Sequence, residues 1–160
     1  MGRWCFAMMV VAVLLCSVPQ ALGAEPELPP PGPKDRCPVC GMFVAPYPDW
    51  TAAARFPDGT LAYFDGPKDM FRYAFAVGKF DPARRDQKVE SLWVTEYYTA
   101  TRMPAAELFF VAGSDVLGPM GHELVPIRGE EGARTFQVDH HGKQVLPFAE
   151  ITPAVVSALP

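Results

Sequence analysis

The chain has 160 residues, of which 49% are hydrophobic, and its 18 acidic residues outnumber the 14 lysines and arginines to give a formal net charge of −4. A chain of this length can form one domain with a substantial core and needs no disulfide framework to fold. The acidic balance provides no basic surface to neutralise phosphates, which argues against binding to nucleic acid.

Residues 1–24 have the pattern of a secretory signal peptide. Arg3 precedes an uncharged apolar run over 4–18, and small residues follow as far as Ala24. The run is shorter than the roughly 20 residues that a membrane-spanning helix needs. The sequence therefore predicts export, and a periplasmic location for the mature chain.

The alternative to simple cleavage is a lipid anchor on Cys16. A lipid-bearing cysteine normally follows a small residue, whereas Cys16 follows Leu15, so cleavage near Ala24 is favoured over lipidation. Cleavage there leaves Cys37 and Cys40 as the two thiols of the mature chain.

The mature chain is predicted to begin with a linker and to continue as one metal-binding domain. Residues 25–35 contain five prolines and few residues to bury, which is typical of an extended linker. We expect the domain to extend over 36–151 and a C-terminal tail over 152–160.

Hydrophobic patterning predicts two halves with the same order of elements, strand, strand, helix, strand. In the first half, strands at 51–56 and 60–64 flank a turn, Asp65 is expected to cap a helix at 66–78, and a strand follows at 89–95. In the second half we expect strands at 107–112 and 122–127, a helix at 130–140 and a strand at 144–148. The predicted fold class is α+β, with two similar ββαβ halves packed into one domain.

The most distinctive motif is the Cys-x-x-Cys pair formed by Cys37 and Cys40. A thioredoxin-like redox pair would need a helix after the first cysteine, but glycine, methionine and several prolines follow the pair. A structural zinc site would need two further ligands, usually from a second such pair. A local disulfide is also compatible with an oxidising compartment, so the pair alone does not identify a function.

Two methionines favour copper(I) among the metals. Thiolate and thioether sulfurs are soft donors that select copper(I) over zinc, calcium or magnesium. Met42 lies two residues after Cys40 and is either a ligand or the start of a core segment. Met120 lies in the turn-forming segment Gly-Pro-Met-Gly, where a core methionine would have no apolar face to join, so we interpret it as a ligand.

The histidines are less informative. His122 lies two residues after Met120, where its imidazole could reach the same ion, bind a second one or simply be exposed. His140 and His141 close the predicted second helix and are assigned structural roles.

Candidates for catalysis are sparse, so we do not expect an enzyme. Ser114 follows a glycine but does not lie in a nucleophile elbow, and the sequence contains no HExxH motif. Asp65, Asp69 and Glu96 are scattered along the chain and are attributed to capping or solvent exposure.

Taken together, four segments resemble the NosL family of exported copper chaperones, which supply copper(I) for assembly of nitrous oxide reductase. They are Cys-Pro-Val-Cys-Gly-Met at 37–42, Tyr-Phe-Asp-Gly at 63–66, Leu-Trp-Val-Thr-Glu-Tyr at 92–97 and Gly-Pro-Met-Gly-His at 118–122. The resemblance implies copper(I) bound by Cys40, Met42 and Met120, with His122 as a further ligand or part of a second site. It leaves Cys37 as a ligand, a disulfide partner or a redox gate.

The expected function is therefore delivery of copper(I) to an apo-metalloenzyme. The implied partners are apo nitrous oxide reductase or a related copper acceptor, together with a membrane copper exporter or an ABC-type assembly complex. Two alternatives remain. One is a periplasmic thiol-disulfide redox protein that uses Cys37 and Cys40, and the other is an interaction module with a structural disulfide.

Overall fold

A computed structural model describes residues 28–159 of the chain. The predicted signal peptide and residues 25–27 of the predicted linker lie outside the described residues. The first half comprises β1 (Ala52–Arg55), β2 (Leu61–Phe64), α1 (Pro67–Phe75), α2 (Val77–Phe80), β3 (Ser91–Thr95) and β4 (Arg102–Pro104). The second half comprises β5 (Leu108–Gly118), β6 (Gly121–Arg128), α3 (Glu130–Asp139), β7 (Gln144–Pro147) and α4 (Pro153–Ser157). Short 3-10 turns lie at Pro82–Arg84, Ala105–Glu107 and Phe148–Glu150.

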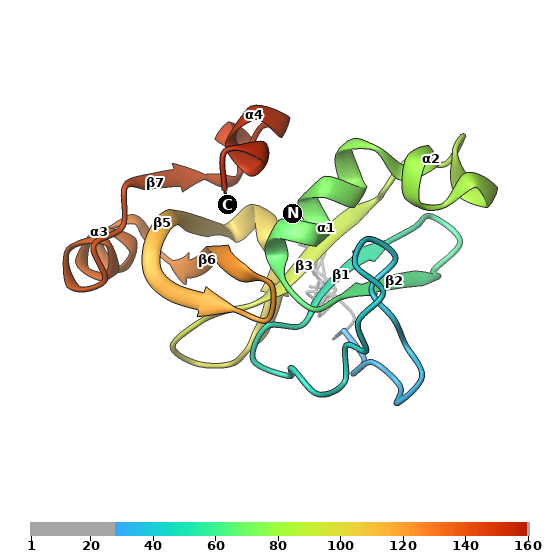
Figure 1. The fold of residues 1–160 in the computed structure, drawn as a ribbon, viewed down its shortest axis with the longest axis horizontal. Helices are drawn as coiled ribbons and strands as arrows, with labels where there is room; N and C mark the ends of the chain where they lie inside the picture. The colour runs from blue at the N-terminus through green and yellow to red at the C-terminus, as the bar shows by residue number, and fades with distance from the viewer. Residues whose placement is uncertain (1–27, 160) are drawn as a thin grey trace, which may run out of the picture.

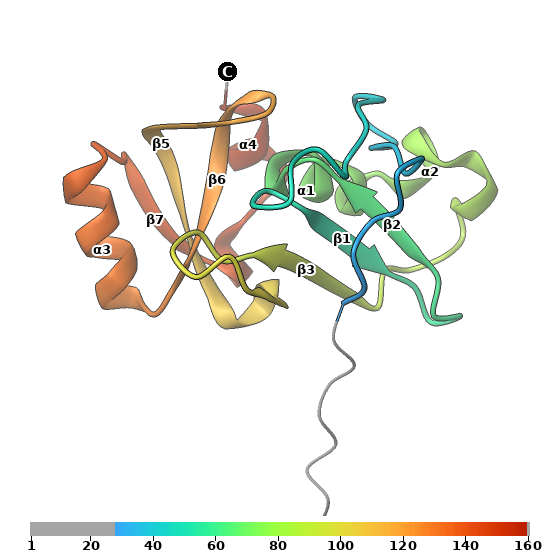
Figure 2. The same ribbon diagram turned by 90° about the horizontal axis from the view of Figure 1, so that it is seen from below.

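The strands form two antiparallel sheets, one in each half. Their orders are β2-β1-β3-β4 and β6-β5-β7. In both halves a hairpin leads into a helix, and the next strand pairs with the first strand of that hairpin. This confirms the predicted α+β fold with two ββαβ halves. The halves lie side by side along the long axis of the molecule, with α1 at their junction and α3 at the far end (Figures 1 and 2).

Helix α1 begins and ends differently from the prediction. The N-cap residue is Gly66, which is followed by Pro67, and no side chain caps the helix, so the predicted capping role of Asp65 is wrong. The helix ends at Phe75 because Ala76 leaves helical geometry with a φ of −149°. The residues that follow form the separate short helix α2.

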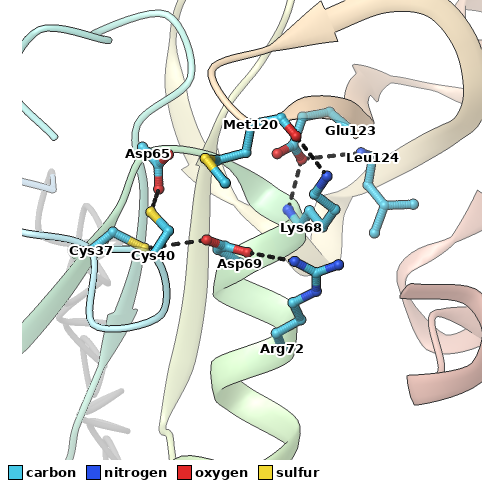
Figure 3. Close-up of polar contacts among 9 residues, drawn as sticks. All are labelled: Cys37, Cys40, Asp65, Lys68, Asp69, Arg72, Met120, Glu123 and Leu124. Atoms are coloured by element: carbon cyan, nitrogen blue, oxygen red, sulfur yellow. Dashed lines mark hydrogen bonds and ion pairs between the residues drawn. The ribbon is translucent and has the colours of Figure 1, made fainter. Parts of the chain in front are cut away.

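The hairpin of β5 and β6 is longer than predicted. Strand β5 continues past Ala112 through an irregular register and ends at Gly118, which pairs with Gly121. The two residues between them, Pro119 and Met120, form the tip of the hairpin, where Gly121 has a φ of +81°. The tip projects toward α1 of the first half (Figure 3).

Aromatic side chains join the two halves in one core. Phe71 on α1 contacts Phe110 on β5 edge to face, with ring centroids 5.3 Å apart, and it also contacts Phe148. Phe71 and Phe110 are both completely buried. A second cluster lies beneath α3 and contains Val111, Val125, Ile127, Ala133 and Phe136.

Both ends of the described chain pack against the domain. Leu28, in the predicted linker, is buried against Ala53 and Trp93, and the carbonyl of Pro29 accepts a hydrogen bond from Tyr63. The predicted C-terminal tail contains α4, whose Val156 is buried. Within residues 28–159, none of the helices combines the length and the apolar character that crossing a bilayer requires.

We predict that Phe110→Ala destabilises the fold by about 3–5 kcal/mol, because it removes a fully buried ring from the junction of the halves. Urea denaturation followed by circular dichroism measures the change. Val138→Ala is the control, since Val138 is 75% exposed and its loss should change stability by less than about 0.5 kcal/mol. Equal stability of the two variants would contradict this description of the core.

Candidate metal centre

The segment 37–42 forms a tight loop that places both thiols on one side. The amide of Cys37 donates to the carbonyl of Met42 at 2.8 Å, and the amide of Gly41 donates to the carbonyl of Cys37 at 2.8 Å. Gly41 has a φ of +80°, a conformation that glycine adopts readily. The loop is thus closed by its own backbone, and Cys40 lies within it. Both cysteines are free thiols.

Two aspartates face the thiols from the beginning of α1. Asp65 follows β2 directly, and Asp69 lies in the first turn of the helix. The sulfur of Cys40 donates to Asp65 Oδ1 at 3.2 Å, and the sulfur of Cys37 donates to Asp69 Oδ2 at 3.5 Å (Figure 3). One potential ligand atom from each of the four residues lies within 4.8 Å of the others. We call these four residues the Cys/Asp cluster.

The cluster is largely shielded from solvent. Cys37, Asp65 and Asp69 are each at most 2% exposed, whereas Cys40 is half-buried. Arg72 pairs with Asp69 Oδ1 at 3.1 Å and so balances one of the two carboxylates. Asp65 Oδ2 is buried and has no hydrogen-bond partner. A buried, unpaired carboxylate oxygen is costly in free energy, and a bound cation would supply the missing partner.

The surroundings of the thiols keep them protonated in the metal-free protein. Burial raises the pKa of Cys40 to about 11, and the carboxylate of Asp65 adds to this rise. Burial raises the pKa of Cys37 still further, again with a contribution from Asp65. A metal cation would replace these protons, because metal ligation requires the thiolate form. The cluster therefore has the donors and the charge to hold a cation.

Met120 lies at the tip of the β5–β6 hairpin, where the second half meets α1. Its backbone carbonyl accepts a hydrogen bond of 3.0 Å from Lys68 Nζ on α1. Its side chain is 42% exposed, and the thioether points toward the side of Asp65 and Cys40 (Figure 3). The fold thus turns a third sulfur, from a distant part of the sequence, toward the side of Asp65 and Cys40 (Figure 3).

The other two residues proposed from sequence are placed differently. The carbonyl of Met42 closes the cysteine loop, and its side chain is partly buried. His122 lines a cavity of about 430 Å³ together with Gly113, Lys143 and residues of α4. Its Nδ1 atom is buried there without a hydrogen-bond partner. The structure therefore does not bring His122 into the Cys/Asp cluster.

Sequence reasoning missed the two aspartates. The assignment of Asp65, Asp69 and Glu96 to capping or solvent exposure is wrong, because all three side chains are buried and the two aspartates accept hydrogen bonds from the thiols. Helical spacing could not have paired them, because Asp65 precedes the extended N-cap residue Gly66 and only Asp69 lies within the helix. Met70 and Met103, in contrast, are buried in the core.

Comparison with known proteins gives a consistent family match. The family model described as NosL matches residues 30–156. The fold is similar to that in the crystal structure of the copper chaperone NosL from Shewanella denitrificans, with a TM-score of 0.66 and 21% identity over 81% of this chain and 99% of that chain. A solution NMR structure of the apo-NosL protein from Achromobacter cycloclastes has a TM-score of 0.48 and 25% identity over 66% of this chain and 87% of that chain. Comparison with curated proteins gave no match.

We predict that Asp65→Asn accelerates alkylation of Cys40 in the reduced, metal-free protein. The carboxylate raises the pKa of the thiol, so its removal lowers that pKa and enlarges the reactive thiolate fraction at a fixed, mildly alkaline pH. While the thiol remains mostly protonated, each unit by which its pKa falls should raise the thiolate fraction, and with it the alkylation rate, about tenfold. The measurement is the iodoacetamide reaction rate of Cys40, resolved by peptide mass spectrometry.

Asp86→Asn is the matched control, since Asp86 is exposed and lies outside the cluster. It should leave the rate unchanged. A rate for Asp65→Asn equal to or below that of the parent would mean that this carboxylate does not act on the thiol.

Proposed function

The chain belongs to the NosL family, and from this premise we propose that it is an exported copper(I) chaperone that delivers the ion to an apo-metalloenzyme. The observation that carries the proposal is the convergence of two thiols and two carboxylates within 4.8 Å. The similarity in fold to a structure described as a copper chaperone supports the same conclusion.

The choice of copper(I) follows from the sulfur donors. Cys40 and Met120 are the principal proposed ligands, and Met42 and Cys37 are the further sulfur candidates. Soft sulfur donors of this kind select copper(I) among the metals available to proteins. His122 remains a candidate for an additional ligand or a second metal, although its ring would have to leave the cavity that it now lines.

The carboxylates make the site electrostatically suited to a monovalent cation. In the metal-free state they accept hydrogen bonds from the thiols. When a thiol becomes a ligand it loses its proton, and the positive charge of copper takes the place of that proton beside the carboxylates. Since protons and copper compete for the same sulfurs, affinity for copper(I) should rise with pH.

Release of the ion depends on the unequal exposure of the sulfurs. Met120 is 42% exposed and Cys40 is half-buried, while Cys37 is 1% exposed. A ligand of the acceptor can therefore approach from the side of Met120, form a bond to copper as the thioether leaves, and displace the cysteines afterwards. The thiols then recover protons from solvent. Stepwise exchange of this kind never requires a free copper ion.

The family resemblance supports nitrous oxide reductase in its apo form as the client, with a related copper enzyme as the alternative acceptor. A membrane copper exporter or an ABC-type assembly complex is the proposed partner on the membrane side. The predicted signal peptide supports a periplasmic location, where these partners and the chaperone could meet.

The rival proposal, a thiol-disulfide redox protein, is less well supported. Catalytic cysteines of such proteins have lowered pKa values, because a helix N-terminus or a nearby cation stabilises the thiolate. Here burial and carboxylates raise the pKa of both Cys37 and Cys40. A slow, non-catalytic disulfide between them would still be compatible with the loop.

We predict that Cys40→Ala and Met120→Leu each lower the affinity for copper(I) without unfolding the domain. The loss should reach at least about 100-fold for Cys40→Ala and about tenfold or more for Met120→Leu. Mutation of residues that only support a metal ligand typically lowers metal affinity by about 10- to 100-fold, and loss of a ligand itself should cost at least as much. Anaerobic competition with a copper(I) chelator measures affinity, and circular dichroism checks the fold.

Met103→Leu is the control for the methionine variant. Met103 is buried in the core, and exchange between Met and Leu is well tolerated there. Copper(I) affinity should match that of the parent. If Cys40→Ala and Met120→Leu also bind copper(I) as the parent does, the proposed ligands are wrong.

A further inference from the structure

A third buried carboxylate, Glu123 on β6, lies next to the metal site but outside the Cys/Asp cluster. Glu123 is 2% exposed. Its Oε2 atom accepts a hydrogen bond of 2.8 Å from the amide of Lys68, in the first turn of α1, and one of 3.2 Å from the amide of Leu124 (Figure 3). The side chain therefore ties the hairpin of the second half to the helix that carries Asp69.

Two glycines make room for this carboxylate, one from each half. A Cβ atom at Gly66, the N-cap of α1, would clash with Glu123 Oε1. A Cβ atom at Gly118, at the end of β5, would clash with the Cγ atom of the same side chain. Glu123 thus lies in a cradle that requires glycine on both sides, and this indicates a specific anchoring position at the junction of the halves.

Lys68 completes the connection to Met120. The lysine is 2% exposed, and its ammonium donates to the carbonyl of Met120 at 3.0 Å. Burial raises the pKa of Glu123 to about 8, and the positive charge of Lys68 opposes this rise. Glu123 therefore contacts Lys68, and Lys68 in turn contacts the backbone of Met120. We call Glu123 and Lys68 the hairpin anchor. Met120 itself lies at a two-residue tip with a side chain that is 42% exposed.

We propose that Glu123 and Lys68 are positioning residues, which hold the hairpin tip so that the thioether of Met120 stays over the Cys/Asp cluster. The inference rests on the proposed function, in which Met120 is a copper ligand. An exposed thioether at an unanchored tip would have to be ordered each time copper binds, which would weaken its contribution. Neighbours that fix a ligand in place beforehand remove that cost.

The anchor predicts a specific pattern in a double-mutant cycle with copper(I). Glu123→Ala should lower the affinity by about 10- to 100-fold, as the loss of an outer-shell partner does. In the Met120→Leu background, Glu123→Ala should cause no further loss, because the ligand that it positions is already absent. Glu123→Gln should stay close to the parent, since its amide oxygen can accept the same backbone hydrogen bonds.

Glu96 provides a matched control. It is also a buried carboxylate, and it accepts backbone hydrogen bonds from Thr99 at 2.8 Å and Arg128 at 3.3 Å. Glu96→Ala should destabilise the fold comparably without a loss of affinity that depends on Met120. If Glu123→Ala itself fails to fold, Gly118→Ala takes its place in the cycle. The added Cβ atom would displace the Glu123 side chain, while every hydrogen-bonding group stays in the chain.

A metal-free measurement separates this inference from the proposed function. With methyl-labelled methionine, the NMR signal of Met120 should shift and gain mobility in Glu123→Ala, but not in Glu123→Gln or Glu96→Ala. If the parent binds no copper(I), the proposed function fails, and the metal-free signal still decides whether the anchor exists. Equal losses of affinity in both Met120 backgrounds, no loss in either, or an unchanged Met120 signal would each overturn the proposed positioning role.

Discussion

Asp65 and Asp69 are buried beside two thiols, and this burial determines the electrostatics of the candidate site. Removing carboxylates from water is costly unless hydrogen bonds or opposite charges compensate for it. Arg72 and the two thiols provide part of that compensation, while one oxygen of Asp65 remains buried without a partner. The site is therefore built for positive charge, which protons supply in the metal-free state and a soft cation could supply in the loaded state.

The division into two halves gives the proposed metal site one buried side and one exposed side. The first half supplies the buried side of the site through the cysteine loop and the start of α1. The second half supplies an exposed methionine at the tip of a hairpin. Contact between Phe71 and Phe110 fixes the halves against each other, while the tip depends on the smaller set of contacts around Lys68 and Glu123.

Much of the fold could be predicted because its elements are local and strongly patterned. The order of both ββαβ halves followed from hydrophobic spacing. The sulfur residues were visible as motifs. The aspartates were missed because a carboxylate near the start of a helix has the same sequence pattern whether it caps the helix, faces solvent or points into a site. The direction of His122 and the burial of Glu123 depend on how the hairpin packs against α1, and local sequence does not specify that contact.

We propose that the Cys/Asp cluster and Met120 together hold copper(I) only when the thiols are reduced. The most direct test is an anaerobic titration of copper(I) into the protein in competition with a chelator, with free thiols counted in the same sample. We expect reduced protein to remove copper(I) from the chelator and its thiols to become protected as it does so, whereas oxidised protein should do neither. Reduced protein that retains both free thiols yet leaves all the copper on the chelator would contradict the proposal.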